Sequence, residues 1–529
     1  MTVDERSPRS DAPPPPRHGW APRAVIDAVL SRIHRFWSDH RWLSAHRGQL
    51  VCLDLIDGRT VGGTLLDHGL SSVKLCDSRA GTTVVVERST IAALRPGEPG
   101  TASGPTDATT EIDSTALQTT VLIRRPPRPY PSPRESTTTA IALFLGTLLI
   151  YAVSHQGDGL PFNYFVRLAD AFLHGRLYLT ENPSWLSELI PWEGNYYVVF
   201  PPMPAILLTP FVAVFGPDFP QPALSIVLGA ANVGLAYLVL LRLFRNPSVA
   251  LWTAVLYGIG TNQWYHAENG NAWYVAQITA LFFLWLALLE ATTRRRLLVI
   301  GLCMSGAFLS RVTVLGALAF FLVYFWDRFV QVAPLRQHLR IRVFIKPLIA
   351  IGLGLSAGFV VAALYNWARF GSVTEFGYKL IPGVLEEPWY SHGLISTEYI
   401  GVHLEEMFTR LPRFQREAPF VIPRVYVMAF WVTTPAWVLI LFARFRSRVA
   451  IASVAAILAT LPPIIMHGGP GFTQFGHRFS LDYIPFLLLL TASGMRDRVT
   501  WWKQALILIS IAINIWGVLM LSFYDTWVF

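Results

Sequence analysis

The chain has 529 residues, of which 53% are hydrophobic and 15% are charged, and its mean hydropathy is +0.41. This composition excludes an ordinary soluble enzyme and favours a polytopic membrane protein with a soluble part. The net charge of +9 is not evidence for a nucleic-acid partner, because the excess Lys and Arg lie mainly in short loops beside apolar runs and in a linker.

The first 137 residues are predicted to form three parts that precede the membrane region. Residues 1–47 contain a proline-rich tail without a signal-peptide core and an amphipathic helix over 21–43, so the N-terminus is expected in the cytoplasm. Residues 48–96 alternate apolar and polar positions around the turn Asp57-Gly58, which predicts five strands in a small all-β barrel. Residues 97–137 have the composition of a flexible linker.

The stretch GQLVCLDLIDGRTVGGTLLDHGLSSVKL, at residues 48–75, resembles the Sm-like (LSm) small-barrel family. The family's first motif has an apolar strand, an Asp-Gly turn and a Gly-bent second strand in this order. Its members often bind RNA through an Asp-x-x-x-Asn signature, which reads Asp67-His68-Gly69-Leu70-Ser71 here. Nucleic acid is therefore not expected, and a cytoplasmic protein partner or a regulatory role is favoured for this domain.

The remaining residues, 138–529, are predicted to form an all-α polytopic membrane domain with about eleven transmembrane helices. The apolar runs are 138–154, 221–243, 248–264, 272–291, 296–310, 311–327, 344–366, 422–443, 447–466, 478–495 and 501–523. The proline-interrupted run 202–216 is interpreted as a helix that enters the outer leaflet without crossing.

Five clusters of Lys and Arg beside these runs predict which loops stay in the cytoplasm. The clusters are Arg242 with Arg245, Arg294–Arg296, Arg328–Lys346, Arg444–Arg448 and Arg496–Lys503. Because positive loops are held on the cytoplasmic side, the two large loops 155–220 and 367–421 are expected outside. The predicted location is the cytoplasmic (inner) membrane, with the active face extracytoplasmic.

Several segments resemble the polytopic GT-C glycosyltransferases, in the branch of the protein mannosyltransferases and aminoarabinose transferases. Members carry an acidic residue after the first span, an amphipathic helix and a proline pair that opens the next apolar helix. The matching segments are Asp158, Tyr164–Gly175, FPPMPAIL at 200–207, GAFLSRVTVL at 306–315, YNWARFGSVTEFGY at 365–378 and QFGHRFSLDYIPFL at 474–487.

The resemblance implies a glycosyltransferase that moves a hexosyl or pentosyl group from a polyprenyl-phosphate donor to an extracytoplasmic glycan, lipid or protein. Membrane lipids are the surrounding partners. The sequence itself is consistent with a donor that is not a nucleotide sugar. No Gly-rich nucleotide fingerprint follows a strand, and the polar groups are expected to face a compartment without nucleotide sugars. A lipid-borne donor suits a site at the membrane interface.

An inverting transfer needs a carboxylate that deprotonates the acceptor and cations that neutralise the leaving phosphate. Asp158 is the candidate base because it follows the first span, although a Gly-Asp-Gly turn also suits an exposed loop. Asp170 is the second candidate, and its helical position equally suits a solvated face or an ion pair with Arg167 or His174. Relatives often show an Asp-Glu pair where this chain has Asp158-Gly159.

Guanidinium groups near the outer ends of spans suit phosphate oxygens. The donor-phosphate candidates are Arg478, Arg311, Lys379 and His477, and the substrate-binding candidates are Tyr164, Arg167, Glu268 and Tyr197. Glu268 is expected in a short external turn, and the aromatic side chains also suit an interfacial belt. No cofactor is expected, and the histidine spacing does not indicate a metal site.

Two other classes stay open. A lipid or solute transporter would also have many spans, but transporters tend to show inverted repeats and midplane charges, whereas the polar residues here collect in two loops. A non-catalytic GT-C-like scaffold would fit the missing acidic pair.

Overall fold

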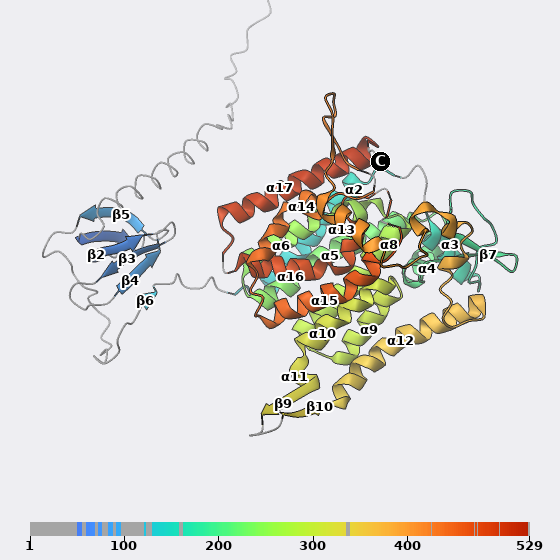
Figure 1. The fold of residues 1–529 in the computed structure, drawn as a ribbon, viewed down its shortest axis with the longest axis horizontal. Helices are drawn as coiled ribbons and strands as arrows, with labels where there is room; N and C mark the ends of the chain where they lie inside the picture. Colours follow the sequence, from blue (N-terminus) through green and yellow to red (C-terminus); the bar gives the residue numbers. More distant parts are fainter. Residues whose placement is uncertain are drawn as a thin grey trace, which may run out of the picture. The chain divides into compact units, whose positions relative to one another are not determined.

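The computed structural model describes strands between Leu50 and Leu122 and, from Tyr130 to Thr526, all residues except 158–161, 335–338, 425, 470, 473 and 497. The chain divides into two compact units, Met1–Pro129 and Tyr130–Phe529 (Figure 1). The tail and helix predicted over residues 1–47 lie outside the described residues.

The first unit contains a twisted sheet with the order β5-β1-β2-β3-β4-β6, in which the first five strands pair antiparallel and β6 pairs parallel to β4. The strands are β1 Leu50–Leu55, β2 Thr60–His68, β3 Ser72–Cys76, β4 Thr83–Glu87, β5 Ile91–Pro96 and β6 Val121–Leu122. Strands thus occupy the places expected from the alternating pattern, while the Sm-like barrel and its partner stay predictions.

The second unit is mainly helical, and six of its described helices are long and apolar enough to cross a membrane, which makes the chain a multi-pass membrane protein. These are α2 Pro133–Ser154, α5 Gln221–Phe244, α8 Ala272–Thr292, α12 Ile345–Phe370, α15 Arg448–Ile465, and α17 Trp501–Val518 with its continuation η8 Leu519–Phe523. The predicted total of about eleven spans stays a prediction.

Shorter helices separate these long ones. Those with apolar sequences are α4 Met203–Phe215, α6 Pro247–Ile259, α9 Leu297–Phe308, η2 Val312–Ala317 with α10 Leu318–Tyr324, and α16 Ile484–Met495. The other helices are α3 Tyr164–Leu173, α7 Gln263–Asn269, α11 Trp326–Phe329, η3 Tyr378–Leu380, η4 Val384–Glu386, η5 Pro388–Tyr390, α13 Tyr399–Thr409, α14 Phe430–Thr433, η6 Pro435–Phe442 and η7 Arg478–Tyr483.

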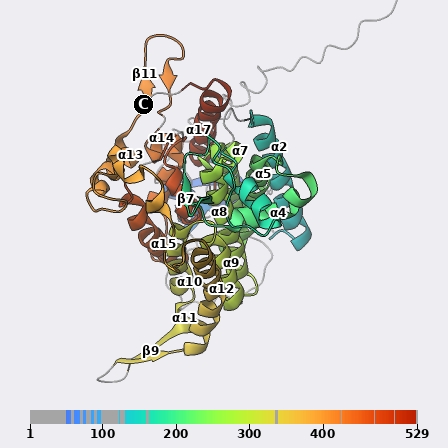
Figure 2. The same ribbon diagram turned by 90° about the vertical axis from the view of Figure 1, so that its right-hand side faces the viewer.

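The described part of this unit also contains three small antiparallel strand pairs. They are β7 Leu189–Trp192 with β8 Asn195–Val198, β9 Val330–Pro334 with β10 Leu339–Val343, and β11 Arg413–Phe414 with β12 Val421–Ile422. Figure 2 shows that the hairpins containing β9 and β11 project from opposite sides of this unit.

The core lies around α5 and α8. Within their most apolar windows 78% and 72% of residues are buried, against 22% in α2 and 33% in α12. Large apolar side chains such as Leu149 of α2 and Leu364 of α12 are therefore exposed on the outside of the unit, as expected for helices that face lipid.

Two predicted boundaries differ from the structure for local reasons. Helix α2 begins inside the predicted linker, because Ser132 and Glu135 form a reciprocal capping box with Pro133 in the first turn. The apolar run predicted as a span over 422–443 is broken into β12, α14 and η6. Pro435 lacks an N–H and disfavours the helical conformation of the residue before it, and Thr434 is accordingly non-helical, with φ −143° and ψ 77°.

Candidate functional site

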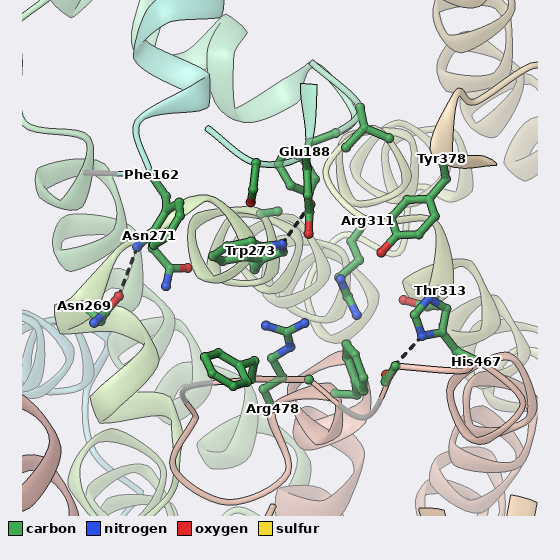
Figure 3. Close-up of a pocket in the computed structure, with 18 of the residues that line it drawn as sticks. Phe162, Glu188, Asn269, Asn271, Trp273, Arg311, Thr313, Tyr378, His467 and Arg478 are labelled. Carbon is green, nitrogen blue, oxygen red and sulfur yellow. Dashed lines mark hydrogen bonds between the residues drawn. The ribbon is translucent and has the colours of Figure 1, made fainter. Parts of the chain in front are cut away.

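A cavity of about 1150 Å³ lies where the two predicted external loops meet the ends of the helices. The first loop contributes Ser187 and Glu188, and the second contributes Tyr378 and Glu387. Helix α8 adds Trp273 near its start. Segments far apart in the sequence therefore form one chamber (Figure 3).

Two guanidinium groups face each other across this cavity. Figure 3 shows Arg311 and Arg478 directed into the same space. The Phe479 ring lies beside both, with its centroid 5.2 Å from Cζ of Arg311 and 4.9 Å from Cζ of Arg478. Arg478 also lies over the Trp273 ring, at 5.9 Å. Such a pair suits an anionic group, because guanidinium nitrogens match phosphate oxygens in geometry.

The two arginines differ in their partners. Nε of Arg311 lies 2.7 Å from both carboxylate oxygens of Asp482, a side chain that is only 1% exposed. Nε of Arg478 is buried and has no hydrogen-bond partner among the described residues. Arg311 is thus neutralised by a neighbour, whereas Arg478 is the cation more readily offered to a ligand.

Glu188 places a carboxylate opposite these cations. Its Oε2 accepts a hydrogen bond of 3.2 Å from Nε1 of Trp273, and its backbone N–H donates to the Tyr164 hydroxyl at 2.9 Å. Burial raises the pKa of Glu188 from 4.5 to about 7, although the Trp273 hydrogen bond and the Arg478 charge favour the ionised form. A carboxyl with this pKa can exchange a proton near neutral pH.

Aromatic and histidine side chains form the wall beside Arg311. The hydroxyls of Tyr378 and Tyr390 lie 3.2 Å apart, and both rings contact the His467 ring at centroid distances of 6.0 and 5.6 Å. Burial lowers the pKa of His467 to about 4, so this imidazole is neutral at physiological pH. The positive charge offered to a ligand therefore comes from the arginines.

Glu268 also lines the cavity, but its surroundings differ from those expected. The sequence predicted a short external turn, whereas Glu268 lies in α7 and is 1% exposed. Its Oε1 accepts a hydrogen bond from the Ser522 hydroxyl at 2.5 Å, and its Oε2 lies 3.9 Å from Nδ1 of His155. Packing of α7 against α5, α8 and α17 buries the segment.

The other predicted site residues in the described part of the chain lie away from the cavity lining. Tyr164 is buried and supports the backbone of Glu188, and Tyr197 packs on Phe370 at 5.4 Å. His477 is 1% exposed and packs under Phe479. Helical and loop packing thus turns these three side chains toward the protein interior.

Three charged candidates have local partners instead. Asp170 lies 3.6 Å from Nδ1 of His174, one of the ion-pair partners the sequence offered. Nε of Arg167 donates to Asn163 at 3.2 Å. Lys379 is 61% exposed and pairs with Glu375 at 3.2 Å.

Asp158 lies outside the described residues. Gly157 and Phe162, the nearest described residues on either side, both line the cavity.

Glu188 and Asp482 were missed by the sequence reading. Glu188 stands in the loop stretch SWLSELIPW, where its neighbours form no motif that distinguishes it. Asp482 had a usable signal, because an acidic residue inside the apolar run 478–495 demands a partner.

No protein-family model matches the chain, and no curated protein matches it. Among solved structures, the chain is similar to ArnT from Cupriavidus metallidurans bound to undecaprenyl phosphate, with 12% identity, a TM-score of 0.42 and coverage of 74% of this chain and 65% of that chain. ArnT from the same organism in the apo state gives 13% identity, a TM-score of 0.41 and coverage of 70% and 62%. The chain thus spans less than two thirds of these structures, and a likeness of this degree assigns neither an activity nor a substrate to it.

Proposed function

We propose that the chain is a membrane glycosyltransferase of GT-C type that uses a polyprenyl-phosphate sugar donor. The observation that carries this proposal is the meeting of Glu188 with Arg311 and Arg478 around one cavity. A base near neutrality and a pair of phosphate-binding cations are the groups that sugar transfer from a phosphate requires. The ordered GT-C-like segments along residues 138–495 give independent support.

The proposed reaction is a single displacement. An acceptor hydroxyl oxygen attacks the anomeric carbon and forms the new glycosidic bond, while the bond from that carbon to the donor phosphate oxygen breaks. The hydroxyl proton passes to the carboxylate base, and the phosphate leaves with the bonding electron pair. Arg311 and Arg478 stabilise its charge. Attack from the face opposite the phosphate inverts the anomeric centre, whether the sugar is a hexose or a pentose.

Glu188 and Asp158 are the two proposed bases. Glu188 has the support of position and of a pKa of about 7, while Asp158 follows the first span as in the GT-C proteins that the chain resembles. Asp170 ranks behind both, because it pairs with His174 and does not line the cavity.

The proposed setting is the cytoplasmic membrane, with the cavity open to the outer side and the acceptor a glycan, lipid or protein there. The basic clusters support this orientation, because loops such as that of Arg294–Arg296 are expected inside. We further propose that the N-terminal domain is an Sm-like module that contacts a cytoplasmic protein.

The first experiment compares cell-envelope glycans with and without the gene, because the missing sugar and its acceptor are then identified together.

Purified protein is next assayed with polyprenyl-phosphate sugars of that type. We expect Glu188→Gln or Asp158→Asn to lower the rate of transfer about 100-fold, and the exposed Glu181→Gln to leave it unchanged. Vesicles that move polyprenyl-phosphate sugar across the bilayer without transferring it would replace this proposal with a transporter. Unaltered glycans with no transfer in vitro would favour a scaffold.

A further inference from the structure

We propose that Asp482 is a positioning residue that fixes the direction of Arg311 and ties it to the backbone of Arg478. The inference rests on the proposed function, because it assigns unequal tasks to the two phosphate-binding arginines. Asp482 itself lies behind Arg311, outside the cavity lining, and acts through that side chain.

The contact between Asp482 and Arg311 uses only one edge of the guanidinium group. Nε of Arg311 is 2.7 Å from Oδ1 and 2.7 Å from Oδ2 of Asp482. Because Nε makes this contact, both terminal nitrogens stay available for phosphate oxygens. The Arg311 side chain is 21% exposed and lines the cavity, whereas Asp482 is 1% exposed and does not line it.

Two further side chains hold the carboxylate of Asp482 in place. The Thr313 hydroxyl donates to Oδ2 of Asp482 from the turn that also carries Arg311. The Gln277 amide lies 3.5 Å from Oδ1 of Asp482 and donates to the carbonyl oxygen of Arg478 at 3.0 Å. The same network therefore fixes the Arg311 side chain and the backbone at Arg478.

The pairing gives the arginines different electrostatic roles. Asp482 cancels much of the charge of Arg311, which leaves that residue as a directional hydrogen-bond donor. Arg478 contacts the faces of Trp273 and Phe479 and has its Nε unpartnered within the described residues. Without Asp482, Arg311 would keep its charge but lose its fixed direction, and a fixed direction is what stabilises the departing phosphate.

A double-mutant cycle tests this inference. Asp482→Asn, Arg311→Ala and the double variant are assayed for sugar transfer, and binding of farnesyl phosphate is measured in detergent micelles. We expect Asp482→Asn to lower kcat about tenfold with less than a threefold change in donor KM in the wild-type background. In the Arg311→Ala background the same substitution should change transfer and binding less than twofold.

Glu290→Gln is the matched control, because Glu290 is a buried carboxylate that pairs with Arg296 at 2.9 Å away from the cavity. We expect it to leave kcat and farnesyl phosphate binding unchanged.

If Asp482→Asn has the same effect in both backgrounds, Asp482 does not act through Arg311 and the inference is overturned. A variant that fails to fold is replaced by Thr313→Val, which loosens the same carboxylate and should show the same background dependence. Wild-type protein that neither transfers sugar nor binds farnesyl phosphate would instead overturn the proposed function, and the inference with it.

Discussion

At the scale of the residue, the site depends on how burial changes an ordinary carboxyl group. Glu188 in open solvent would be ionised at all physiological pH values, since the usual pKa is near 4.5. Its position beside Trp273 and directly before the buried Leu189 of β7 removes water and raises the pKa to about 7. A group with this pKa accepts a proton readily and releases it again.

The pH dependence of transfer follows from this pKa. Below pH 7 Glu188 is protonated and cannot act as a base, so the rate should fall about tenfold per pH unit on the acid side and level off above pH 7. In Glu188→Gln this fall in rate at acid pH, the acid limb of the pH profile, should disappear together with most of the activity. The measurement is kcat/KM from pH 5 to 9. An acid limb that persists near pH 7 in the Gln variant would assign it to another group, with Asp158 the first to examine.

The hydrogen bond from Trp273 should set the pH at which this acid limb occurs. Its indole N–H favours the ionised form of Glu188, so Trp273→Phe keeps an aromatic ring under Arg478 but removes the donor. The pKa of Glu188 should rise, and the limb should move about one pH unit upward, since a hydrogen bond to a charged group is worth roughly 1.5–3 kcal/mol. Phe162→Leu, on the same cavity wall without a bond to the carboxylate, is the control. A midpoint unchanged in Trp273→Phe would show that the indole does not control the base.

The sequence carries a signal for two of the cationic candidates and none for Glu188. Arg311 and Arg478 stand beside apolar runs, where the cost of burying a charge marks them out, and both line the cavity. Glu188 lies in a loop without a recognisable motif, and its proposed role depends on the hydrogen bond between that loop and Trp273 of α8. Glu188 and Trp273 are 85 residues apart in the chain, so no local sequence pattern predicts their hydrogen bond.

At the scale of the element, helix α9, which leads into Arg311, packs on α12 through small residues. Helices α9 and α12 meet at Gly301 and Gly354, where a Cβ would lie 2.3 Å from the backbone oxygens of Ile351 and Leu298. Ser305 donates to the Gly354 carbonyl at 2.8 Å across the same contact. Close packing of this kind is typical of helices in membranes.

Gly354→Ala should therefore loosen the α9–α12 pair. The added methyl cannot fit without backbone movement, so the free energy of unfolding should fall by about 1–3 kcal/mol. Gly352→Ala is a matched control in the same helix, because nothing lies within 4 Å of its Cβ position. Thermal unfolding in detergent compares the two, and equal midpoints would show that the helices do not depend on this contact.

Periodicity and hydropathy located the long helices but not their interruptions. Six predicted runs coincide with helices long enough to span, because twenty apolar residues in sequence have few other stable conformations in lipid. The run 422–443 is not one continuous helix and Glu268 does not lie in an exposed turn, because a proline interrupts the first segment and tertiary packing of the short helix α7 buries the second.

At the scale of the whole molecule, the two large loops close over one cavity although about 200 residues separate Ser187 from Glu387. A shared chamber requires both loops to lie on the same side of the bilayer. The basic loop Arg294–Arg296, at the opposite end of α8 from Trp273, should then lie on the other side. The cavity thus requires both loops to lie on one side of the bilayer, and the positions of the basic loops predict that this side is extracytoplasmic.

Cysteine labelling tests that orientation. In a variant without the native cysteines, Ser187→Cys and Glu387→Cys should react with a membrane-impermeant maleimide in intact cells, because both positions are exposed and line the cavity. Thr293→Cys, an exposed position beside the basic loop, should react only after permeabilisation. A bulky label at either cavity position should also stop sugar transfer, whereas the label at position 293 should not. The reverse labelling pattern would place the cavity in the cytoplasm, where nucleotide sugars replace lipid-borne donors as the natural substrates.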